Sequence, residues 1–263
     1  MKSMVEGLVF STDDAIARLV LNRPDKKNAV NQAMWKEISR IVETLGRSGG
    51  ARVLILSGQG ADFCAGADIS EFDTVRKDAA TARSYEAANS RAFRALREAP
   101  FPVIAAISGI CFGGGFGLAS ACDLRIATPD ARFAVPAGRL GLAYPQDAMG
   151  DIVTATGSQM ARYLAYSAAQ IGAEMALRAG FLLEILSDQT ELAARADDIA
   201  AAIAANAPLS VQASKLAIRA VQAHGEALAR HAQEAGDATF DSEDYAEGRA
   251  AFRERRSPVF RGR

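Results

Sequence analysis

Histidine is scarce in this sequence, and its scarcity limits the chemistry that the side chains can perform. Only two of the 263 residues are histidine, His224 and His231, and both lie near the C-terminus. This leaves almost no room for a histidine-based catalytic triad or a metal site with several histidine ligands. Any catalysis must come from carboxylates, tyrosine, cysteine or backbone amides. The two histidines are seven residues apart, so one continuous helix would place them on a shared face, in solvent or in a subunit contact.

Cysteine is also sparse, and its spacing indicates neither a disulfide framework nor a zinc site. The three cysteines, Cys64, Cys111 and Cys122, are odd in number and form no CxxC pair. Cys111 precedes a glycine run, but no histidine near it in the sequence could activate it as a nucleophile, so packing is its expected role. The N-terminal residues contain no apolar stretch typical of a secretory signal, which predicts a cytoplasmic location.

The chain lacks an apolar run suited to a membrane and an excess of either charge. Residues 101–121 form the longest candidate span, but five glycines interrupt it, which favours a buried strand, turn and helix. Lysine and arginine number 30 against 31 acidic residues. This balance argues against nucleic acid or an anionic membrane as a partner. Hydrophobic residues make up 49% of the chain, which excludes wholesale disorder.

Apolar runs and turn residues predict an α/β body followed by a helical region. Strands are expected at residues 7–10, 15–21, 52–57, 103–108, 124–127 and 132–134, and helices at 31–45, 79–98 and 118–121. From residue 146 onward the strand signal disappears, and helical patterns continue to residue 255. We therefore place an α/β core in residues 1–200 and a helical C-terminal region in 201–263. The rhythm of two strands and a helix predicts stacked ββα units, with a doubly wound parallel sheet as the alternative.

Two loops rich in small residues follow apolar strands. They are FCAGADI at 63–69 and FGGGFGLASA at 112–121, and the second fits neither the GxGxxG nor the GxxxxGK[ST] phosphate-binding motif. Small residues ahead of a helix leave backbone N–H groups exposed. At the ends of neighbouring strands, two such loops could aim two N–H groups at one point and form an oxyanion hole. The alternative is a pair of tight turns that only allow strand and helix to pack.

Five ordered segments of the chain resemble the enoyl-CoA hydratase/isomerase (crotonase) family. They are LNRPDKKNAVN at 21–31, FCAGADISEF at 63–72, PVIAAISGICFGGGFGLASACDLRIA at 102–127, FAVPAGRLGLAYP at 133–145 and EGRAAFRERRSPVFRGR at 247–263. The resemblance implies a crotonase-like ββα superhelix, a helical C-terminal trimerisation region, and a homotrimer or a dimer of trimers. It also implies an acyl-CoA thioester as the substrate, a role in fatty acid metabolism, and coenzyme A as part of the substrate with no permanently bound cofactor.

The resemblance assigns ligand-binding roles to particular residues. The backbone amides of Ala67 and Gly114 correspond to the pair that holds the thioester oxygen in that family. The segment at 21–31 corresponds to one that contacts coenzyme A, although a solvated basic turn is the alternative for its lysines; its candidates are Lys26, Lys27 and Ala29. The other candidates for contact with the ligand lie in the first loop or in the tail: Ala65, Asp68, Ile69, Phe252 and Arg255. For Asp68, a role in shaping its own loop is the alternative.

Both glutamates by which hydratases of this family transfer protons are replaced here. The first position holds Gly117 and the second holds Ala137. Because neither residue has a side chain that can exchange a proton, we predict slow hydration. An isomerase that relies on the second glutamate would lack its base as well.

The predicted oxyanion hole therefore remains, and any acid or base must be a side chain at another position. Tyr144 is the catalytic candidate, since some decarboxylase-like members of the superfamily carry a tyrosine near this position; a half-buried wall aromatic is the alternative. Asp147 and Asp151 could also reach the site, although both fit the charged start of a helix. We predict an enzyme that works through a thioester enolate. The alternatives are a non-catalytic acyl-CoA-binding or scaffolding protein, and a nucleotide-binding α/β protein that does not bind coenzyme A.

Overall fold

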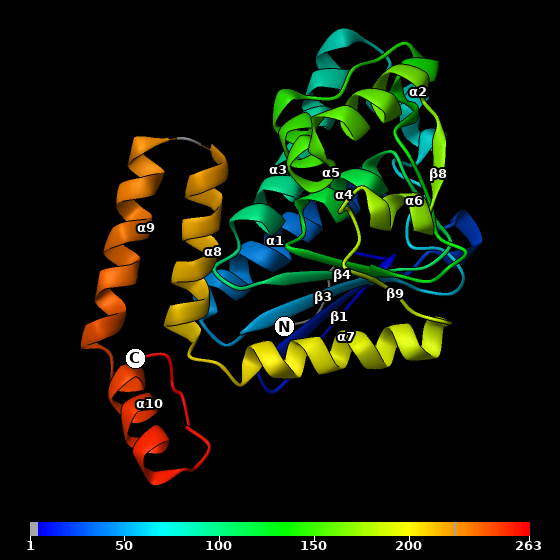
Figure 1. Cartoon of the computed structure of the whole chain (residues 1–263). Coiled ribbons are helices and arrows are strands. Elements are labelled where there is room, and N and C mark those ends of the chain that lie inside the picture. The colour runs from blue at the N-terminus through cyan, green and yellow to red at the C-terminus, as the bar shows by residue number, and fades with distance from the viewer. Residues whose placement is uncertain (1–4, 224) are drawn as a thin grey trace.

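The protein is built around a six-stranded, mostly parallel sheet. The computed structural model describes residues 5–223 and 225–263, and Figure 1 shows its elements. Across the sheet the strands follow one another as β1 (Leu8–Asp13), β2 (Ile16–Leu21), β3 (Val53–Gly58), β4 (Val103–Ile107), β6 (Leu124–Ala127) and β9 (Glu184–Ile185). β1 and β2 form an antiparallel hairpin, and every other neighbouring pair is parallel.

The central strands are apolar on both faces because helices cover both faces. All five residues of β4 are buried. In β3, Leu54 and Leu56 pack in the main core with side chains of α1 (Gln32–Ser48) and α3 (Ala79–Glu98). The alternate residues Val53 and Ile55 pack against α7 (Gln189–Ala204), which lies along the opposite face in Figure 1. Because both faces of such a parallel strand are buried, its sequence is a continuous run of apolar residues.

A second, three-stranded sheet carries the glycine-rich segment. Its strands are β5 (Ile110–Phe112), β7 (Arg132–Ala134) and β8 (Gln170–Gly172). β5 leads almost directly into α4 (Gly114–Ala121), which is buried from its second residue onward. The remaining helices of the body are α2 (Phe72–Val75), α5 (Gln146–Ser167) and α6 (Ala173–Arg178). The glycine-rich segment is thus fixed between the two sheets and the helices that cover them.

The predicted elements are mostly present, and the differences lie where strands are very short. The helix predicted at 79–98 matches α3 at both ends. The expectation that no strand follows residue 146 is wrong, because β8 and β9 lie beyond it, and β5 is missing from the prediction as well. These strands have only two or three residues each, too few to show a periodic pattern. α4 begins four residues before the predicted helix at 118, since buried packing outweighs the low helix propensity of its glycines.

The last three helices form an arm beside the body in Figure 1: α8 (Pro208–Ala223), α9 (Glu226–Ala238) and α10 (Glu243–Glu254). The domain boundary predicted after residue 200 falls inside α7, which ends at Ala204. His224 lies outside the described residues. Gly225 has extended backbone and caps the start of α9, which carries His231, so the continuous helix expected through both histidines is not formed. None of the described helices is long and apolar enough to cross a membrane.

A buried lysine attaches the arm to the body. The side chain of Lys215, on α8, is 6% exposed, and its Nζ donates to Asp123 Oδ2 at 2.7 Å and to the carbonyl oxygen of Phe101 at 3.0 Å. Burial lowers the pKa of Lys215, and the carboxylate of Asp123 offsets only part of that effect. The ammonium group therefore depends on these oxygens to remain buried as a cation.

We expect Lys215→Ala to lower the free energy of unfolding by about 3 kcal/mol, because it leaves a carboxylate and buried carbonyl groups without their cation. Urea unfolding followed by circular dichroism measures this loss. The exposed Lys36 of α1 supplies the control, and Lys36→Ala should change the free energy by less than about 0.5 kcal/mol. Equal unfolding midpoints for the two variants would contradict the anchoring role of Lys215.

Candidate active site

The loop after β3 and the turn between β5 and α4 meet backbone to backbone. Cys64 and Cys111 form a parallel bridge that holds the two segments side by side. At Gly66 the φ angle is +103°, and a Cβ would lie 2.9 Å from the carbonyl oxygen of Phe112 and 3.1 Å from the nitrogen of Gly114. Any other residue at position 66 would be strained and would also push the two segments apart. The contact between the loops therefore depends on this glycine.

The backbone approach brings the N–H groups of Ala67 and Gly114 close together. A Cβ placed on Gly114 would lie 3.5 Å from the nitrogen of Ala67. The adjacent amides of Asp68 and Gly113 donate to backbone carbonyls, but within the described chain no acceptor pairs with the N–H of Ala67 or Gly114. Gly114 opens α4, so its N–H has no partner inside the helix. Two adjacent unpaired donors of this kind can stabilise negative charge on a ligand oxygen.

Ala67 and Gly114 line a mostly apolar cavity of about 180 Å³. Of the other residues singled out from the sequence, Ala65, Ile69, Ala137 and Tyr144 line the same cavity. The rest of the wall is Gly66, Phe72, Arg76, Glu86, Asn89, Phe93, Gly113, Pro136, Leu140, Leu142, Pro145 and Ala148. A small cavity with apolar walls and a few polar groups is the usual form of a small-molecule site.

Tyr144 places a phenol beside the glycine turn. A Cβ on Gly113 would lie 3.6 Å from the Tyr144 hydroxyl oxygen. Burial raises the pKa of Tyr144, and the negative charge of Glu86 raises it further. The phenol therefore keeps its proton at neutral pH and can donate a hydrogen bond, but it is a poor base. Tyr144, the catalytic candidate from the sequence, thus lines the same cavity as Ala67 and Gly114.

Positions 117 and 137, where the sequence resemblance implies glutamates in related hydratases, differ in their surroundings. Gly117 is buried in α4, and a Cβ there would lie 2.7 Å from Cζ of Phe93. The ring of Phe93 packs edge-to-face on Trp35, with the ring centroids 5.6 Å apart. Ala137, in a 3-10 helix at Pro136–Leu140, lines the cavity directly. Phe93 thus fills the space that a side chain at position 117 would need, whereas position 137 merely lacks a functional group.

Three polar residues of the cavity wall were not identified from the sequence. Glu86 and Asn89 lie three residues apart on α3, on the same face as Phe93, and Arg76 follows α2. Arg76 forms an ion pair with Glu86. The spacing 86, 89, 93 on a predicted helix was visible in the sequence. Only the tertiary structure shows that this face borders a cavity rather than solvent.

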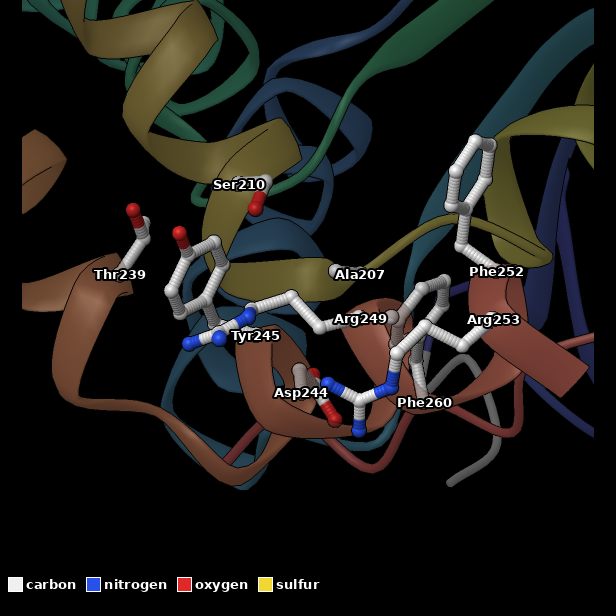
Figure 2. A pocket seen from close by; sticks show the side chains of 10 residues that line it. Ala207, Ser210, Thr239, Asp244, Tyr245, Arg249, Phe252, Arg253 and Phe260 are labelled. Atoms are coloured by element: carbon white, nitrogen blue, oxygen red, sulfur yellow. The ribbon is translucent and has the colours of Figure 1, made fainter.

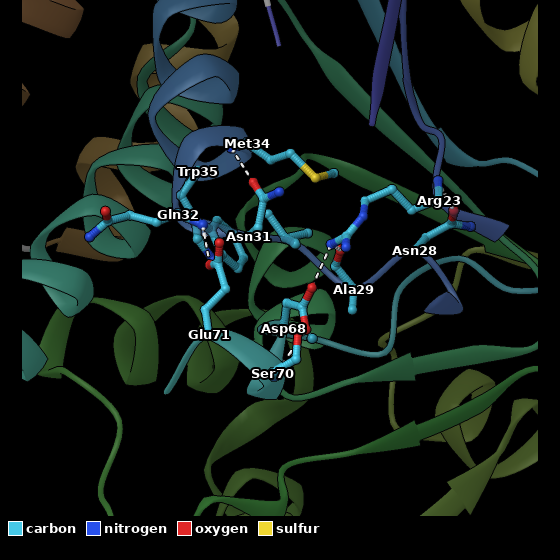
Figure 3. Close-up of polar contacts among 12 residues, drawn as sticks. Arg23, Asn28, Ala29, Asn31, Gln32, Met34, Trp35, Asp68, Ser70 and Glu71 are labelled. Atoms are coloured by element: carbon cyan, nitrogen blue, oxygen red, sulfur yellow. Dashed lines mark hydrogen bonds and ion pairs between the residues drawn. The ribbon is translucent and has the colours of Figure 1, made fainter. Parts of the chain in front are cut away.

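The segment at 21–31 is held against the first loop by buried polar contacts, which Figure 3 shows. Arg23 forms an ion pair with Asp68 at 2.8 Å and donates to the carbonyl oxygen of Ala29. Asn28 is fully buried and donates to the carbonyl oxygens of Gln59 and Asp62. These contacts explain why a short stretch with little regular structure keeps a definite path.

Lys26 and Lys27 are exposed and lie beside the cavity rather than in its wall. The carbonyl oxygen of Lys27 accepts the N–H of Ala65 at 2.9 Å, so the lysine turn touches the loop that carries Ala67. The Asp68 carboxylate does not line the cavity; Arg23 and Ser70 bind it. Burial alone would raise the pKa of Asp68, but hydrogen bonds from Ser70 and Arg23 outweigh burial and hold it below its ordinary value.

The other groups considered from the sequence stand outside this cavity. Asp147 accepts the hydroxyl of Ser90 at 3.2 Å, and Asp151 pairs with Arg97 at 2.6 Å. Burial raises the pKa of Cys111 well above its ordinary value, which agrees with a packing role. Over residues 5–223 and 225–263, histidine, cysteine and acidic side chains form no group of three or more that could hold a metal ion.

The tail residue Phe252 borders a different cavity, of about 470 Å³, in the C-terminal arm. Figure 2 shows its side chains, among them Tyr245 and Arg249 from α10 and Phe260 from the tail. Phe252 is 87% exposed there. Arg255 caps the end of α10 and does not line this cavity. Neither tail residue lines the cavity that holds Ala67 and Gly114.

Comparison with known proteins gives consistent matches along the whole chain. Residues 11–263 match the family described as "Enoyl-CoA hydratase/isomerase". The chain is 34% identical over 249 residues to a Mycobacterium bovis protein named "Probable enoyl-CoA hydratase echA6", covering 95% of this chain and 97% of that protein. It is 31% identical over 218 residues to the mitochondrial Delta(3,5)-Delta(2,4)-dienoyl-CoA isomerase of Mus musculus, covering 79% of this chain and 67% of that protein. A solved enoyl-CoA hydratase/carnithine racemase from Magnetospirillum magneticum aligns with a TM-score of 0.91 and 33% identity, covering 98% of this chain and 97% of the other.

The ion pair between Arg23 and Asp68 should make the site sensitive to acid. Because the folded-state pKa of Asp68 is below the ordinary value of 3.8, the pair stabilises the fold above that value. Its contribution is lost as pH falls through the lowered pKa. We expect Asp68→Asn to cost about 2 kcal/mol of unfolding free energy at pH 6, and the difference from the wild type to shrink below pH 3.8.

Urea unfolding across this pH range tests the Asp68 prediction. Asp73→Asn is the matched control, because Asp73 is exposed and lies in the first turn of the short helix α2. A difference between wild type and Asp68→Asn that stays constant with pH would contradict the proposed effect of ionisation.

Proposed function

The chain belongs to the enoyl-CoA hydratase/isomerase (crotonase) family, and from this premise we propose that it is an enzyme acting on acyl-CoA thioesters. The observation that carries the proposal is the pair of unpaired N–H groups at Ala67 and Gly114 in the wall of an apolar cavity. A thioester oxygen bound between these donors becomes more negative as the reaction proceeds. Donors already in place stabilise that charge without reorganising.

The surroundings of the N–H pair suit the two parts of an acyl-CoA. The apolar cavity accepts the acyl chain. The exposed Lys26 and Lys27 lie on the turn bonded to Ala65, where they can attract the phosphates of coenzyme A, and Ala29 follows them. Coenzyme A enters as part of the substrate. Asp68 contributes by fixing the loop, since its carboxylate is bound to Arg23 and Ser70.

The reaction that fits these groups passes through a thioester enolate. The amides of Ala67 and Gly114 hold the enolate oxygen, and Tyr144, which keeps its proton, can donate a hydrogen bond to the ligand. Ordinary hydration is disfavoured, because neither Gly117 nor Ala137 can activate water or exchange a proton. The alternative is an acyl-CoA-binding or scaffolding protein without catalysis. The close packing of Phe93 over Gly117 favours it, because that packing excludes an acidic side chain from position 117.

We also propose that the C-terminal arm assembles the chain into a homotrimer or a dimer of trimers. The support for this proposal is that the arm of a single chain exposes large apolar side chains to solvent, including Ile218, Val221 and Phe240. Their burial between copies would remove apolar surface from water. The cytoplasmic location and the role in fatty acid metabolism stay predictions from the sequence.

Polarisation of the thioester can be observed directly with a chromophoric ligand. Cinnamoyl-CoA has a conjugated carbonyl, so its absorbance should shift to longer wavelength when the two N–H groups bind its oxygen. Gly114→Ala should reduce the shift and weaken binding at least ~10-fold, because its Cβ would stand 2.9 Å from the Trp35 ring and 3.5 Å from the Ala67 nitrogen. A titration followed by absorbance measures both effects.

Gly150→Ala is the matched control for this titration. It makes the same chemical change on α5, where a Cβ meets no atom within 4 Å. Binding with an unshifted spectrum would contradict the role of the N–H pair. Absence of binding to the wild type would remove the acyl-CoA proposal itself.

Hydration of crotonyl-CoA should be slow in the same preparation that shifts the cinnamoyl-CoA spectrum. We expect a turnover below about 0.01 per second, against a median of about 10 per second for enzymes in general. The reason is that the usual pair of glutamates is absent, and each acid or base group contributes roughly 100- to 10,000-fold. Loss of the crotonyl-CoA absorbance measures the rate. Hydration at an ordinary enzyme rate would show that other groups replace both glutamates.

A further inference from the structure

One carboxylate, Glu86, stands in the wall of the cavity that holds the N–H pair. Among the described residues that line the cavity, it is the only acidic one. Its side chain is 29% exposed, so it is neither sealed in the core nor free in solvent. Glu86 shares a face of α3 with Phe93, whose ring fills the space beside Gly117. Helix α3 thus blocks position 117 with Phe93 and carries the Glu86 carboxylate seven residues before Phe93.

The Glu86 carboxylate is held in place by a cation that is itself fixed. Arg76 pairs with Oε1 of Glu86, and its guanidinium lies 4.4 Å from the ring centroid of Phe72 and 4.5 Å from that of Tyr85. These two rings restrict the guanidinium to one position. A carboxylate anchored in this way keeps a defined place in the cavity wall instead of moving out to solvent.

Glu86 lines the same cavity as Tyr144 and Gly114. The charge of Glu86 raises the pKa of Tyr144, whose hydroxyl lies beside Gly113, next to the Gly114 amide. Burial raises the pKa of Glu86 itself, the charge of Asp147 adds to this rise, and Arg76 and Asn89 offset only part of it. Glu86 is therefore a stronger base than an ordinary glutamate.

We propose that Glu86 is the proton-transfer group of this cavity and that Arg76 and Asn89 position it. The role rests on the acyl-CoA binding proposed above. The Glu86 carboxylate takes a proton from the carbon next to the thioester carbonyl. The electron pair of that C–H bond forms the enolate double bond, and the carbonyl becomes an oxyanion held by the amides of Ala67 and Gly114. Returning a proton from Glu86 to the carbon restores the thioester, so the step needs no oxidant or further reactant.

Exchange of deuterium into butyryl-CoA tests this role whatever the physiological product is. In D2O the Glu86 carboxyl exchanges its proton with solvent and returns a deuteron to the carbon, which mass spectrometry detects. We expect exchange with the wild type, a loss of at least ~100-fold in Glu86→Gln, and butyryl-CoA binding by calorimetry that stays within ~3-fold. The full-length protein is used throughout.

Two further variants keep the test decisive. Glu86→Asp retains the charge for Arg76 and should therefore fold, but it withdraws the carboxylate by one methylene and should slow exchange at least ~10-fold. Glu43→Gln is the control, because Glu43 pairs with the exposed Arg91 on the outer surface, and it should exchange at the wild-type rate.

Each result then supports or overturns the role of Glu86. Undiminished exchange in Glu86→Gln or Glu86→Asp overturns it. Binding of butyryl-CoA by the wild type without any exchange also overturns it, while the binding function remains. No binding by the wild type refutes the proposed acyl-CoA function first, and the role of Glu86 with it.

Discussion

The candidate site depends on one close contact between two backbones. The backbone at Gly66 lies very close to the carbonyl of Phe112 and the amide of Gly114. A Cβ at position 66 would lie only 2.9 Å from that carbonyl oxygen and 3.1 Å from that nitrogen. This contact leaves the N–H groups of Ala67 and Gly114 adjacent and unpaired. Much of the surrounding structure serves to hold the two segments at this distance. The bridge between Cys64 and Cys111 and the buried ion pair of Arg23 with Asp68 both fix the first loop.

The sheet and helices supply the rigidity that such a site needs. β3 and β4 are buried and parallel, and each leads toward one of the two segments that meet. α4 starts where the two segments meet and is buried along nearly all of its length, so the N–H group of its first residue has a fixed position. Donors fixed in advance stabilise charge better than mobile ones, because no free energy is spent on orienting them during the reaction. The fold thus holds two peptide N–H groups close together without a protein acceptor, in the part of the chain that the structure describes.

The resemblance implies that glutamates are replaced at positions 117 and 137, and these two positions differ in their relation to the cavity. At position 117 the change is built into the packing, since Phe93 occupies the space and contacts Trp35. At position 137 the wall remains open to the cavity. The polar side chains of the cavity wall lie on α3 and at the end of α2; they are Glu86, Asn89 and Arg76. In the proposed proton-transfer role, Glu86 would supply the acid–base group that neither Gly117 nor Ala137 can provide.

The sequence by itself indicated the family and its crotonase-like fold through five segments that resemble that family. It also predicted the central elements, because the apolar strands and the helix at 79–98 carry strong pattern signals. It also pointed to Ala67, Gly114 and Tyr144, which the structure brings into one cavity. Only the tertiary structure decided the strands β5, β8 and β9, whose two or three residues are too few for a pattern. It alone decided that Phe93 fills the space at Gly117 and that Glu86 faces a cavity, since periodicity shows which residues share a helix face but not what that face meets.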